Sequence, residues 1–268
     1  MYTSYVTRST WFSPFHQYKT LELMSIFYHP GDWQINPSQA SDALHHHLRV
    51  RRIHQDEVFM VCDGQGQIAT AKLHDSSSDK KSYLELFDIH PDTQMESPYP
   101  LTLIQGLASN EKMNWLIEKA VELGVTKIVP IISKRSIVRL DEQQAKKKIV
   151  HWEQIIIAAC EQSGRTVLPT INPPLTLTNF LAKPSESDQS LRVFLSPHTE
   201  MKFVSIIKRA PGQGLSFLVG PEGGFSDEEN IQIEQAGYIA ATLGKRILRT
   251  ETAGIVAMSA VHSLWGSF

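Results

Sequence analysis

The chain has 268 residues, of which 41% are hydrophobic and 20% are charged, and its formal net charge is −2. This length and composition are typical of a globular protein with one large domain or two modest ones, and the charge balance does not by itself indicate a nucleic-acid partner. The two cysteines, Cys62 and Cys160, lie far apart without metal-type spacing, which argues against a disulfide framework or a zinc site and favours a reducing compartment.

The first 23 residues contain no continuous apolar segment followed by a small-residue cleavage site, so they do not resemble a secretory signal. Met24 is followed at once by a strand-like start at residues 25–28. We interpret residues 1–23 as an extension that is disordered or lies upstream of the true start. The longest apolar runs, such as Ile155–Cys160, are too short to cross a bilayer. We therefore expect a cytoplasmic protein with no membrane association.

Residues 24–92 have the pattern of a small β-barrel domain. Two β-rich runs, residues 57–62 and 67–73, flank the turn Asp63-Gly64-Gln65-Gly66, which predicts a hairpin. A third run, residues 83–89, alternates with period two, and residues 39–47 could form a short helix. The following segment, up to Pro100, contains three prolines without periodicity. We therefore assign residues 93–100 to an interdomain linker.

From residue 101 to 268, strands and helices alternate, which predicts an α/β domain with a parallel sheet. Short apolar runs at residues 101–106, 125–132, 191–195, 215–220 and 239–243 are typical of buried parallel strands. Helices are expected at residues 110–123 and 142–161, and from Glu200, Ser226 and Thr250 onward. Ser226 followed by Glu229 forms a capping-box pattern.

Three loops follow the last three predicted strands: residues 196–198, 220–225 and 244–253. In open parallel sheets, ligands bind beyond the carboxyl ends of the strands, so the three loops can converge on one site. The glycines of Gly220-Pro221-Glu222-Gly223-Gly224 permit close approach of a ligand to the main chain. The same string could be only a tight turn before a helix. A phosphate loop is disfavoured because no Lys-Ser/Thr follows the glycines and Glu222 is acidic.

The string from Val219 to Ser226, followed by Leu243-Gly244-Lys245-Arg246-Ile247-Leu248-Arg249-Thr250-Glu251-Thr252-Ala253, resembles the paired signature of the RsmE family of RNA methyltransferases. Residues 112–125 and 161–165 also match, and residues 46–52 with the Asp63–Gly66 turn resemble the family's first domain. The resemblance covers about residues 26 to 268. No single piece would suffice, but the combination is specific.

The resemblance implies a PUA-like β-barrel followed by a SPOUT domain, an α/β fold with a trefoil knot. It further implies a homodimer that uses S-adenosylmethionine to methylate the N3 imino nitrogen of a uridine in 16S ribosomal RNA of the small subunit. Carried over by motif, the expected cofactor contacts are Leu195, Ser196, Leu218, Val219, Gly220, Pro221, Glu222, Gly223, Leu243, Gly244, Ile247 and Leu248.

Three charged residues of the matching motifs are candidates for catalysis. The imino nitrogen is a poor nucleophile until its proton leaves, so a base or a cation that stabilises the uracil anion would help. We expect Arg249 to position the uracil or to stabilise its negative charge. Glu251 is a candidate for the residue that accepts the imino proton. Glu251 could instead offset the helix dipole, and Glu222 could simply brace the fold.

For RNA, we expect phosphate contacts from Arg49, Arg51 and Arg52 of the barrel, from Arg135, and from Arg165 of an opposing subunit, although an internal ion pair is the alternative for Arg165. The run His45-His46-His47 does not predict a metal site, because adjacent helical side chains point about 100° apart.

Three other functions compete with the uridine methyltransferase. They are a SPOUT enzyme acting on a ribose 2′-hydroxyl or another RNA, a catalytically silent RNA-binding module, and a generic nucleotide-binding enzyme. The Arg-Thr-Glu-Thr-Ala string and the position of the barrel before the α/β domain favour the uridine methyltransferase over a SPOUT enzyme with another target. The intact glycines of the loops argue against a catalytically silent module.

Overall fold

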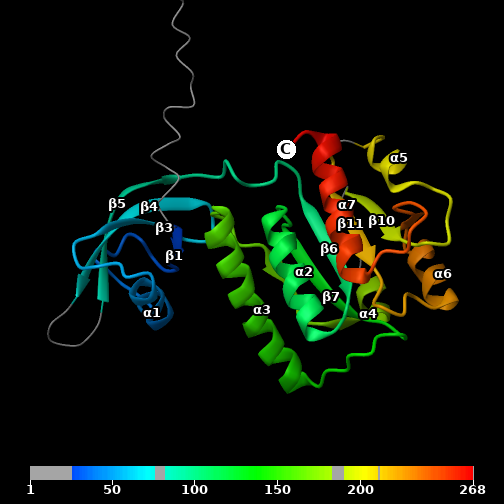
Figure 1. The fold of residues 1–268 in the computed structure, drawn as a ribbon, viewed down its shortest axis with the longest axis horizontal. Coiled ribbons are helices and arrows are strands. Elements are labelled where there is room, and N and C mark those ends of the chain that lie inside the picture. Colours follow the sequence, from blue (N-terminus) through cyan, green and yellow to red (C-terminus); the bar gives the residue numbers. More distant parts are fainter. Residues whose placement is uncertain (1–25, 76–81, 183–189, 211, 268) are drawn as a thin grey trace, which may run out of the picture.

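The computed structural model describes residues 26–75, 82–182, 190–210 and 212–267, so the interpretation of residues 1–23 lies outside the described residues. Two parts are visible, a small β-rich part formed by the amino-terminal third and a larger α/β part, joined by an extended segment (Figure 1). None of the helices in the described ranges has the length and apolarity needed to span a bilayer.

The amino-terminal part is a curled five-stranded sheet with one helix. Its strands have the order β1-β3-β4-β5-β2, and the elements are β1 (Ile26–Tyr28), β2 (Ser38–Gln39), α1 (Asp42–Val50), β3 (Val58–Cys62), β4 (Gln67–Asp75) and β5 (Ser82–Pro91). The predicted hairpin is confirmed as β3 and β4. The expected helix begins later than predicted, because the Ser41 side chain accepts a hydrogen bond from the backbone N–H of Leu44 and so caps α1 there.

The larger part has the predicted parallel sheet, with strand order β12-β10-β11-β6-β7-β8 and β9 paired to β7. Its strands are β6 (Leu101–Gly106), β7 (Lys127–Ile132), β8 (Thr170–Ile171), β9 (Leu175–Thr176), β10 (Leu191–Leu195), β11 (Leu215–Val219) and β12 (Ile239–Ala241). The helices are α2 (Asn110–Glu122), α3 (Glu142–Ser163), α4 (Leu177–Leu181), α5 (Phe203–Ile207), α6 (Asp227–Gln235) and α7 (Thr250–Trp265).

Local capping explains where the long helices begin and end. Asp141 and Gln144 form a capping box at the start of α3, and Gly164 ends that helix with φ of 76°. The predicted capping box of Ser226 and Glu229 is confirmed at α6. The helix expected from Glu200 begins only at Phe203, and the short elements β8, β9 and α4 were not predicted.

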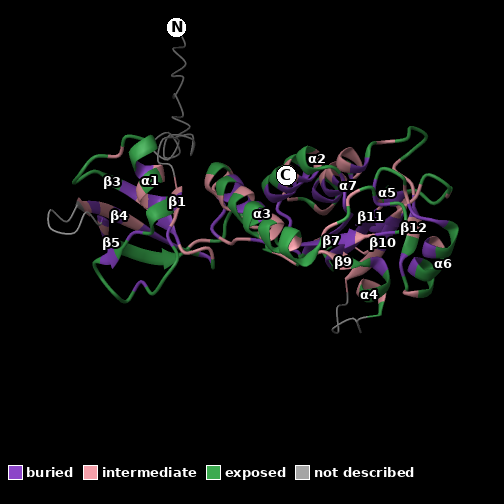
Figure 2. Ribbon diagram, turned by 90° about the horizontal axis from the view of Figure 1, so that it is seen from below, coloured by how far each residue is buried: buried purple, intermediate pink, exposed green. Residues whose placement is uncertain are grey.

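Helices cover both faces of the parallel sheet, whose strands are largely buried (Figure 2). On one face, side chains of α2, α3, α5 and α7 pack against alternate strand residues such as Leu103 and Phe217. On the other face, α4 and α6 pack against the intervening residues such as Ile104 and Leu218. In open parallel sheets the edge formed by the carboxyl ends of the strands is where ligands bind.

The two parts also contact each other directly. The backbone N–H of Gly66 donates to the carbonyl of Thr166 at 3.1 Å, and the backbone N–H of Tyr28 donates to Glu161 at 2.9 Å. Next to this contact, Arg165 is only 2% exposed and donates to Glu96 and to the carbonyls of Val121 and Val125. The guanidinium of Arg165 is buried in an internal ion pair, which favours that alternative over the expected RNA contact.

Candidate functional site

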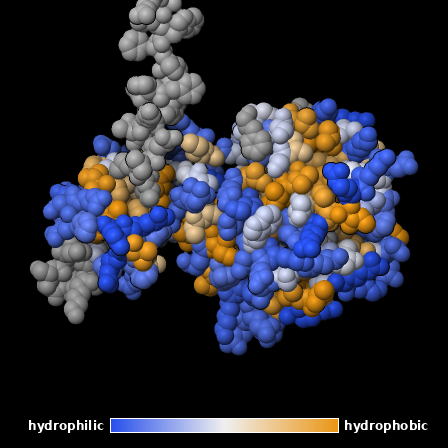
Figure 3. Space-filling model, in the orientation of Figure 1, coloured by the Kyte–Doolittle hydropathy of each residue, from blue (hydrophilic) through white to orange (hydrophobic). Residues whose placement is uncertain are grey.

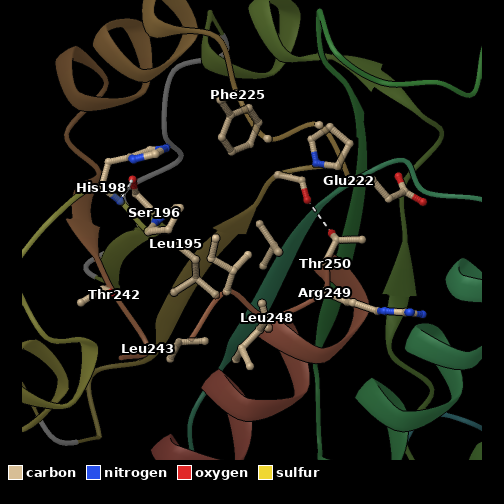
Figure 4. Close-up of a pocket in the computed structure, with 18 of the residues that line it drawn as sticks. Leu195, Ser196, His198, Glu222, Phe225, Thr242, Leu243, Leu248, Arg249 and Thr250 are labelled. Atoms are coloured by element: carbon tan, nitrogen blue, oxygen red, sulfur yellow. Dashed lines mark hydrogen bonds between the residues drawn. The ribbon is translucent and has the colours of Figure 1, made fainter. Parts of the chain in front are cut away.

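A cavity of about 480 Å³ lies at the carboxyl ends of β10, β11 and β12. Its walls come from the three loops singled out in the sequence, which the fold brings together around one space (Figure 4). The volume is within the range of small-molecule sites, and the lining combines apolar side chains with main chain from glycines. Leu195, Leu243 and Leu248 gather on one side, while His198 and Phe225 lie on another (Figure 4).

Hydrogen bonds hold the loop after β11 against the start of α7. The Thr250 hydroxyl donates to the carbonyl of Gly220, and the side-chain amide of Gln105 donates to that hydroxyl at 2.8 Å. Gly106, at the end of β6, lets the loop after β11 pack directly against it. A Cβ atom at Gly106 would lie 2.4 Å from the backbone nitrogen of Pro221, so a side chain would not fit. The ends of β6 and β11 and the first turn of α7 therefore form one connected unit.

Glu222 is bound to the amino-terminal end of α2. One of its carboxylate oxygens accepts from Lys112 Nζ at 3.0 Å and from the backbone N–H of Ser109 at 3.3 Å. Partial burial by itself would raise the pKa of Glu222, but hydrogen bonds from its own backbone, Lys112 and Ser109 outweigh burial and lower that pKa. A carboxylate with a lowered pKa is a weak proton acceptor. This geometry favours bracing over catalysis for Glu222.

Most of the predicted cofactor contacts line the cavity. The lining includes every expected residue except Leu218, namely Leu195, Ser196, Val219, Gly220, Pro221, Glu222, Gly223, Leu243, Gly244, Ile247 and Leu248. Leu218 is fully buried in the core beneath the strand ends, so its side chain does not reach the cavity.

The other two predicted catalytic residues have different positions. Arg249 lines the cavity, and its side chain lies on the same side as that of Glu222 (Figure 4). Glu251 does not line it. Thr250 already faces the cavity, and the next helical residue points about 100° away. The expectation that Glu251 reaches the substrate as a base is therefore not supported by its position.

Several lining residues were missed by the sequence analysis. His198 and Phe225 lie within the loops already predicted to form the site, so their positions in the chain could have identified them as lining residues. Lys112 and Asn230 come from helices α2 and α6, and no motif spacing connects them to the loops. The lining carries four cationic side chains, Lys112, Arg135, Arg246 and Arg249, against the single carboxylate of Glu222. A site with this balance suits an anionic or polyanionic substrate.

The predicted RNA contacts of the barrel are exposed, with Arg49 in α1 and Arg51 and Arg52 directly after it. Arg135, in the turn after β7, is also exposed but donates to two carbonyls of the loop after β11. The adjacent histidines diverge: His45 contacts Ser82, whereas His47 contacts Glu161. In the part of the chain that the structure describes, no group of His, Cys, Asp or Glu is arranged to bind a metal ion.

The family model for an RNA methyltransferase domain matches residues 95–262. The chain belongs to this family. It is also 31% identical over 228 residues to the ribosomal RNA small subunit methyltransferase E of Bacillus subtilis, a match that covers 84% of this chain and 88% of that protein. With the enzyme of the same description from Aquifex aeolicus it shares 34% identity, over 80% of this chain and 88% of that protein.

Solved structures agree with this membership. A ribosomal RNA small subunit methyltransferase E from Neisseria gonorrhoeae, bound to S-adenosyl methionine, has 38% identity and a TM-score of 0.80 and covers 91% of this chain and 99% of that chain. A methyltransferase from Legionella pneumophila in complex with the same cofactor has 31% identity and a TM-score of 0.81, with 90% and 97% covered. The predicted resemblance to the RsmE family is confirmed.

Proposed function

We propose that this protein methylates the N3 imino nitrogen of one uridine in 16S ribosomal RNA of the small subunit, with S-adenosylmethionine as methyl donor. The observation that carries the proposal is the cavity at the strand ends, formed by three loops, two of which contain glycines, in a chain whose relatives are ribosomal RNA methyltransferases. The methylation would be a step of ribosome biogenesis, and the protein would act in the cytoplasm.

The residues of the cavity fit this methyl donor. Leu195, Leu243 and Leu248 offer apolar surface, and main-chain groups near Gly220 and Gly244 can read a purine edge at close range. S-adenosylmethionine supplies a methyl group that is already electrophilic on its sulfonium sulfur. The protein's main contribution is therefore to orient the uracil ring in line with that methyl group.

Arg249 is the residue that we assign to the uracil. The imino proton would pass to solvent water, and N3 would then form a bond to the methyl carbon as the S–CH3 bond breaks and S-adenosylhomocysteine leaves. The negative charge that develops on the ring before this transfer is stabilised by a cation held close to it. Arg249 lines the cavity and carries a permanent charge, whereas Glu222 is already bound to Lys112. In this proposal Arg249 stabilises the anion and Glu222 braces the wall.

The domain assignment also remains a proposal. Residues 24–92 would form a PUA-like RNA-binding barrel, 93–100 the linker and 101–268 a SPOUT domain with a trefoil knot. The separate hydrophobic cores of the two parts support this division. The path from β12, at one edge of the sheet, back to α7 beside β6 and β11 supports the knot.

A homodimer is supported by the exposed side of α2 and α7. Trp115 is 44% exposed and Val256 is 38% exposed, and hydrophobic residues gather between these helices (Figure 3). Within the described residues, the buried oxygens Oδ1 of Asn114 and Oε2 of Glu251 have no hydrogen-bond partner. A second copy could cover the apolar side chains and supply donors to both oxygens. Light scattering on the purified protein tests this: a mass of one chain would refute it.

The activity is tested by mass spectrometry of 16S ribosomal RNA nucleosides from cells that lack the protein. We expect 3-methyluridine to disappear and to return when the wild-type chain is restored. The Arg249→Met variant should fail to restore it. An unchanged 3-methyluridine level after loss of the protein would refute the activity, and a lost 2′-O-methyl nucleoside would favour the ribose-directed alternative.

A further inference from the structure

Arg135 connects the ends of two strands of the parallel sheet. It lies in the turn that follows β7, and its Nη1 donates to the carbonyl oxygens of Gly223 at 3.3 Å and Phe225 at 3.1 Å. Both carbonyls belong to the loop after β11, which forms a wall of the cavity. The side chain therefore binds the loop that the proposed cofactor would contact.

The turn that carries Arg135 is itself fixed. The backbone N–H of Ser133 donates to the hydroxyl of Ser136 at 3.0 Å, the backbone N–H of Ser136 donates to the carbonyl of Ser133 at 3.1 Å, and both serines are buried. The backbone N–H of Lys134 donates to Glu229 at 2.7 Å, and the other oxygen of Glu229 caps the start of α6. Arg135 thus starts from a backbone position that is held on both sides.

The loop is also shaped to accept the arginine. A Cβ atom at Gly223 would lie 3.0 Å from Cβ of Arg135 and 3.2 Å from its carbonyl oxygen, so the glycine leaves room for the arginine. Gly224, the next residue, has φ of +64°. Adjacent glycines have many alternative conformations, so such a loop needs external contacts to keep one of them.

We propose that Arg135 is a positioning residue for the cofactor loop. Its guanidinium holds the two carbonyls of residues 223 and 225 and so keeps the loop in the shape that leaves the cavity open. The inference rests on the proposed function, because it concerns binding of S-adenosylmethionine. It replaces the sequence-based expectation that the main task of Arg135 is to contact an RNA phosphate. Ordering of the loop before the cofactor binds reduces the entropic cost of binding.

Isothermal titration of the full-length protein with S-adenosylmethionine tests the proposal. Arg135→Met keeps an unbranched stem but removes the donors, so we expect about tenfold weaker binding, equivalent to about 1.4 kcal/mol. Arg135→Lys retains a charged donor on a shorter side chain that reaches the two carbonyls less well, and its affinity should be intermediate. Arg139→Met, at an exposed arginine just beyond the same turn, is the matched control and should bind like the wild type.

Kinetics separate positioning from a general folding defect. We expect Arg135→Met to raise KM for S-adenosylmethionine while kcat at saturation stays close to that of the wild type. A misfolded fraction would instead lower kcat and the binding stoichiometry at unchanged affinity, which would refute the proposal. Gly223→Ala, which crowds Arg135 from the opposite side, should also weaken cofactor binding.

Binding of a ribosomal RNA fragment distinguishes the two roles of Arg135. Cofactor affinity like that of the wild type in Arg135→Met, together with weaker RNA binding and a smaller salt dependence, would identify a phosphate contact and overturn the inference. If the wild-type protein itself gave no heat with S-adenosylmethionine, the proposed function would fail first and this inference with it. Wild-type binding with an unaffected Arg135→Met variant would remove this inference alone.

Discussion

The hydroxyl of Thr250, in the first turn of α7, donates a hydrogen bond to the carbonyl oxygen of Gly220 at the end of β11. Gln105, at the end of β6, donates to the same hydroxyl and is itself fully buried. Chain segments from three places in the sequence are joined by this one side chain. The cavity wall at Gly220 is therefore fixed by the residue that begins α7.

Replacement of Thr250 should measure the strength of this connection. We expect Thr250→Val to lower the free energy of unfolding by about 1–3 kcal/mol, because the buried amide of Gln105 and the partly buried carbonyl of Gly220 each lose a partner. Urea denaturation measures the change. Thr250→Ser keeps the hydroxyl and is the control, so equal losses in both variants would show that the hydrogen bonds are not responsible.

Gly106 should not tolerate a side chain. A Cβ atom there would lie 2.4 Å from the nitrogen and 2.6 Å from Cδ of Pro221, and the backbone would have to shift. We expect Gly106→Ala to cost about 1–3 kcal/mol, as overpacking does, and to weaken cofactor binding. Gly254→Ala in α7 is the matched control, since its nearest contacts are side-chain atoms at 3.4 and 3.6 Å. If the two variants melt alike, the proposed crowding is wrong.

Glu222 should contribute to stability as a carboxylate and not to the reaction as a base. Because its folded pKa is lowered from 4.5, its contribution is present above pH 4.5 and is lost as the pH falls through the lowered value. Wild type and Glu222→Gln should therefore differ in stability at neutral pH and converge in acid. Between pH 6 and 8, the pH dependence of kcat should be the same for both. A pH-dependent limb that disappears only in the variant would identify Glu222 as the base.

His262 should make the fold sensitive to mild acid. Its ring is 4% exposed, Nε2 donates to the carbonyl of Leu123, and Nδ1 contacts Tyr99 at 3.0 Å. Burial lowers its pKa from 6.5, although the hydrogen bond to Leu123 opposes this. The stability that follows from the neutral ring is complete above pH 6.5 and falls as the pH drops below it.

The variant His262→Gln isolates this effect from that of His29, whose pKa burial also lowers. We expect His262→Gln to be less stable than the wild type at pH 7.5 and to lose less stability between pH 6.5 and pH 5. Denaturant midpoints across this range measure both slopes. Parallel slopes would show that His262 does not titrate in this way.

The arrangement of the loops could be predicted from the sequence, because parallel strands bring their carboxyl ends to one edge of the sheet. The capping box at Ser226 and the hairpin at Asp63–Gly66 could also be predicted, because each depends on residues that are close together in the sequence. Lys112 was not assigned to the site, because its approach to Glu222 depends on how α2 packs against the sheet. Glu251 was assigned a role that its helical position does not favour.

The hydrogen-bond partners of the arginines also could not be predicted from the sequence. Arg135 and Arg165 are both cations near helices or strand ends, and nothing in their local sequence distinguishes exposed from buried guanidinium groups. The fold places Arg165 against Glu96 in the linker and Arg135 against two loop carbonyls. Which acceptors a long side chain meets depends on contacts between residues that are far apart in the chain.

A crystal structure of the protein with S-adenosylmethionine is the most direct test of the methyl-donor site. We expect the adenosyl group to lie among Leu195, Gly220 and Leu248, with the hydrogen bond between Thr250 and Gly220 intact. Density for the cofactor at another place, or loops that separate and leave no enclosed space at the ends of β10, β11 and β12, would contradict the account.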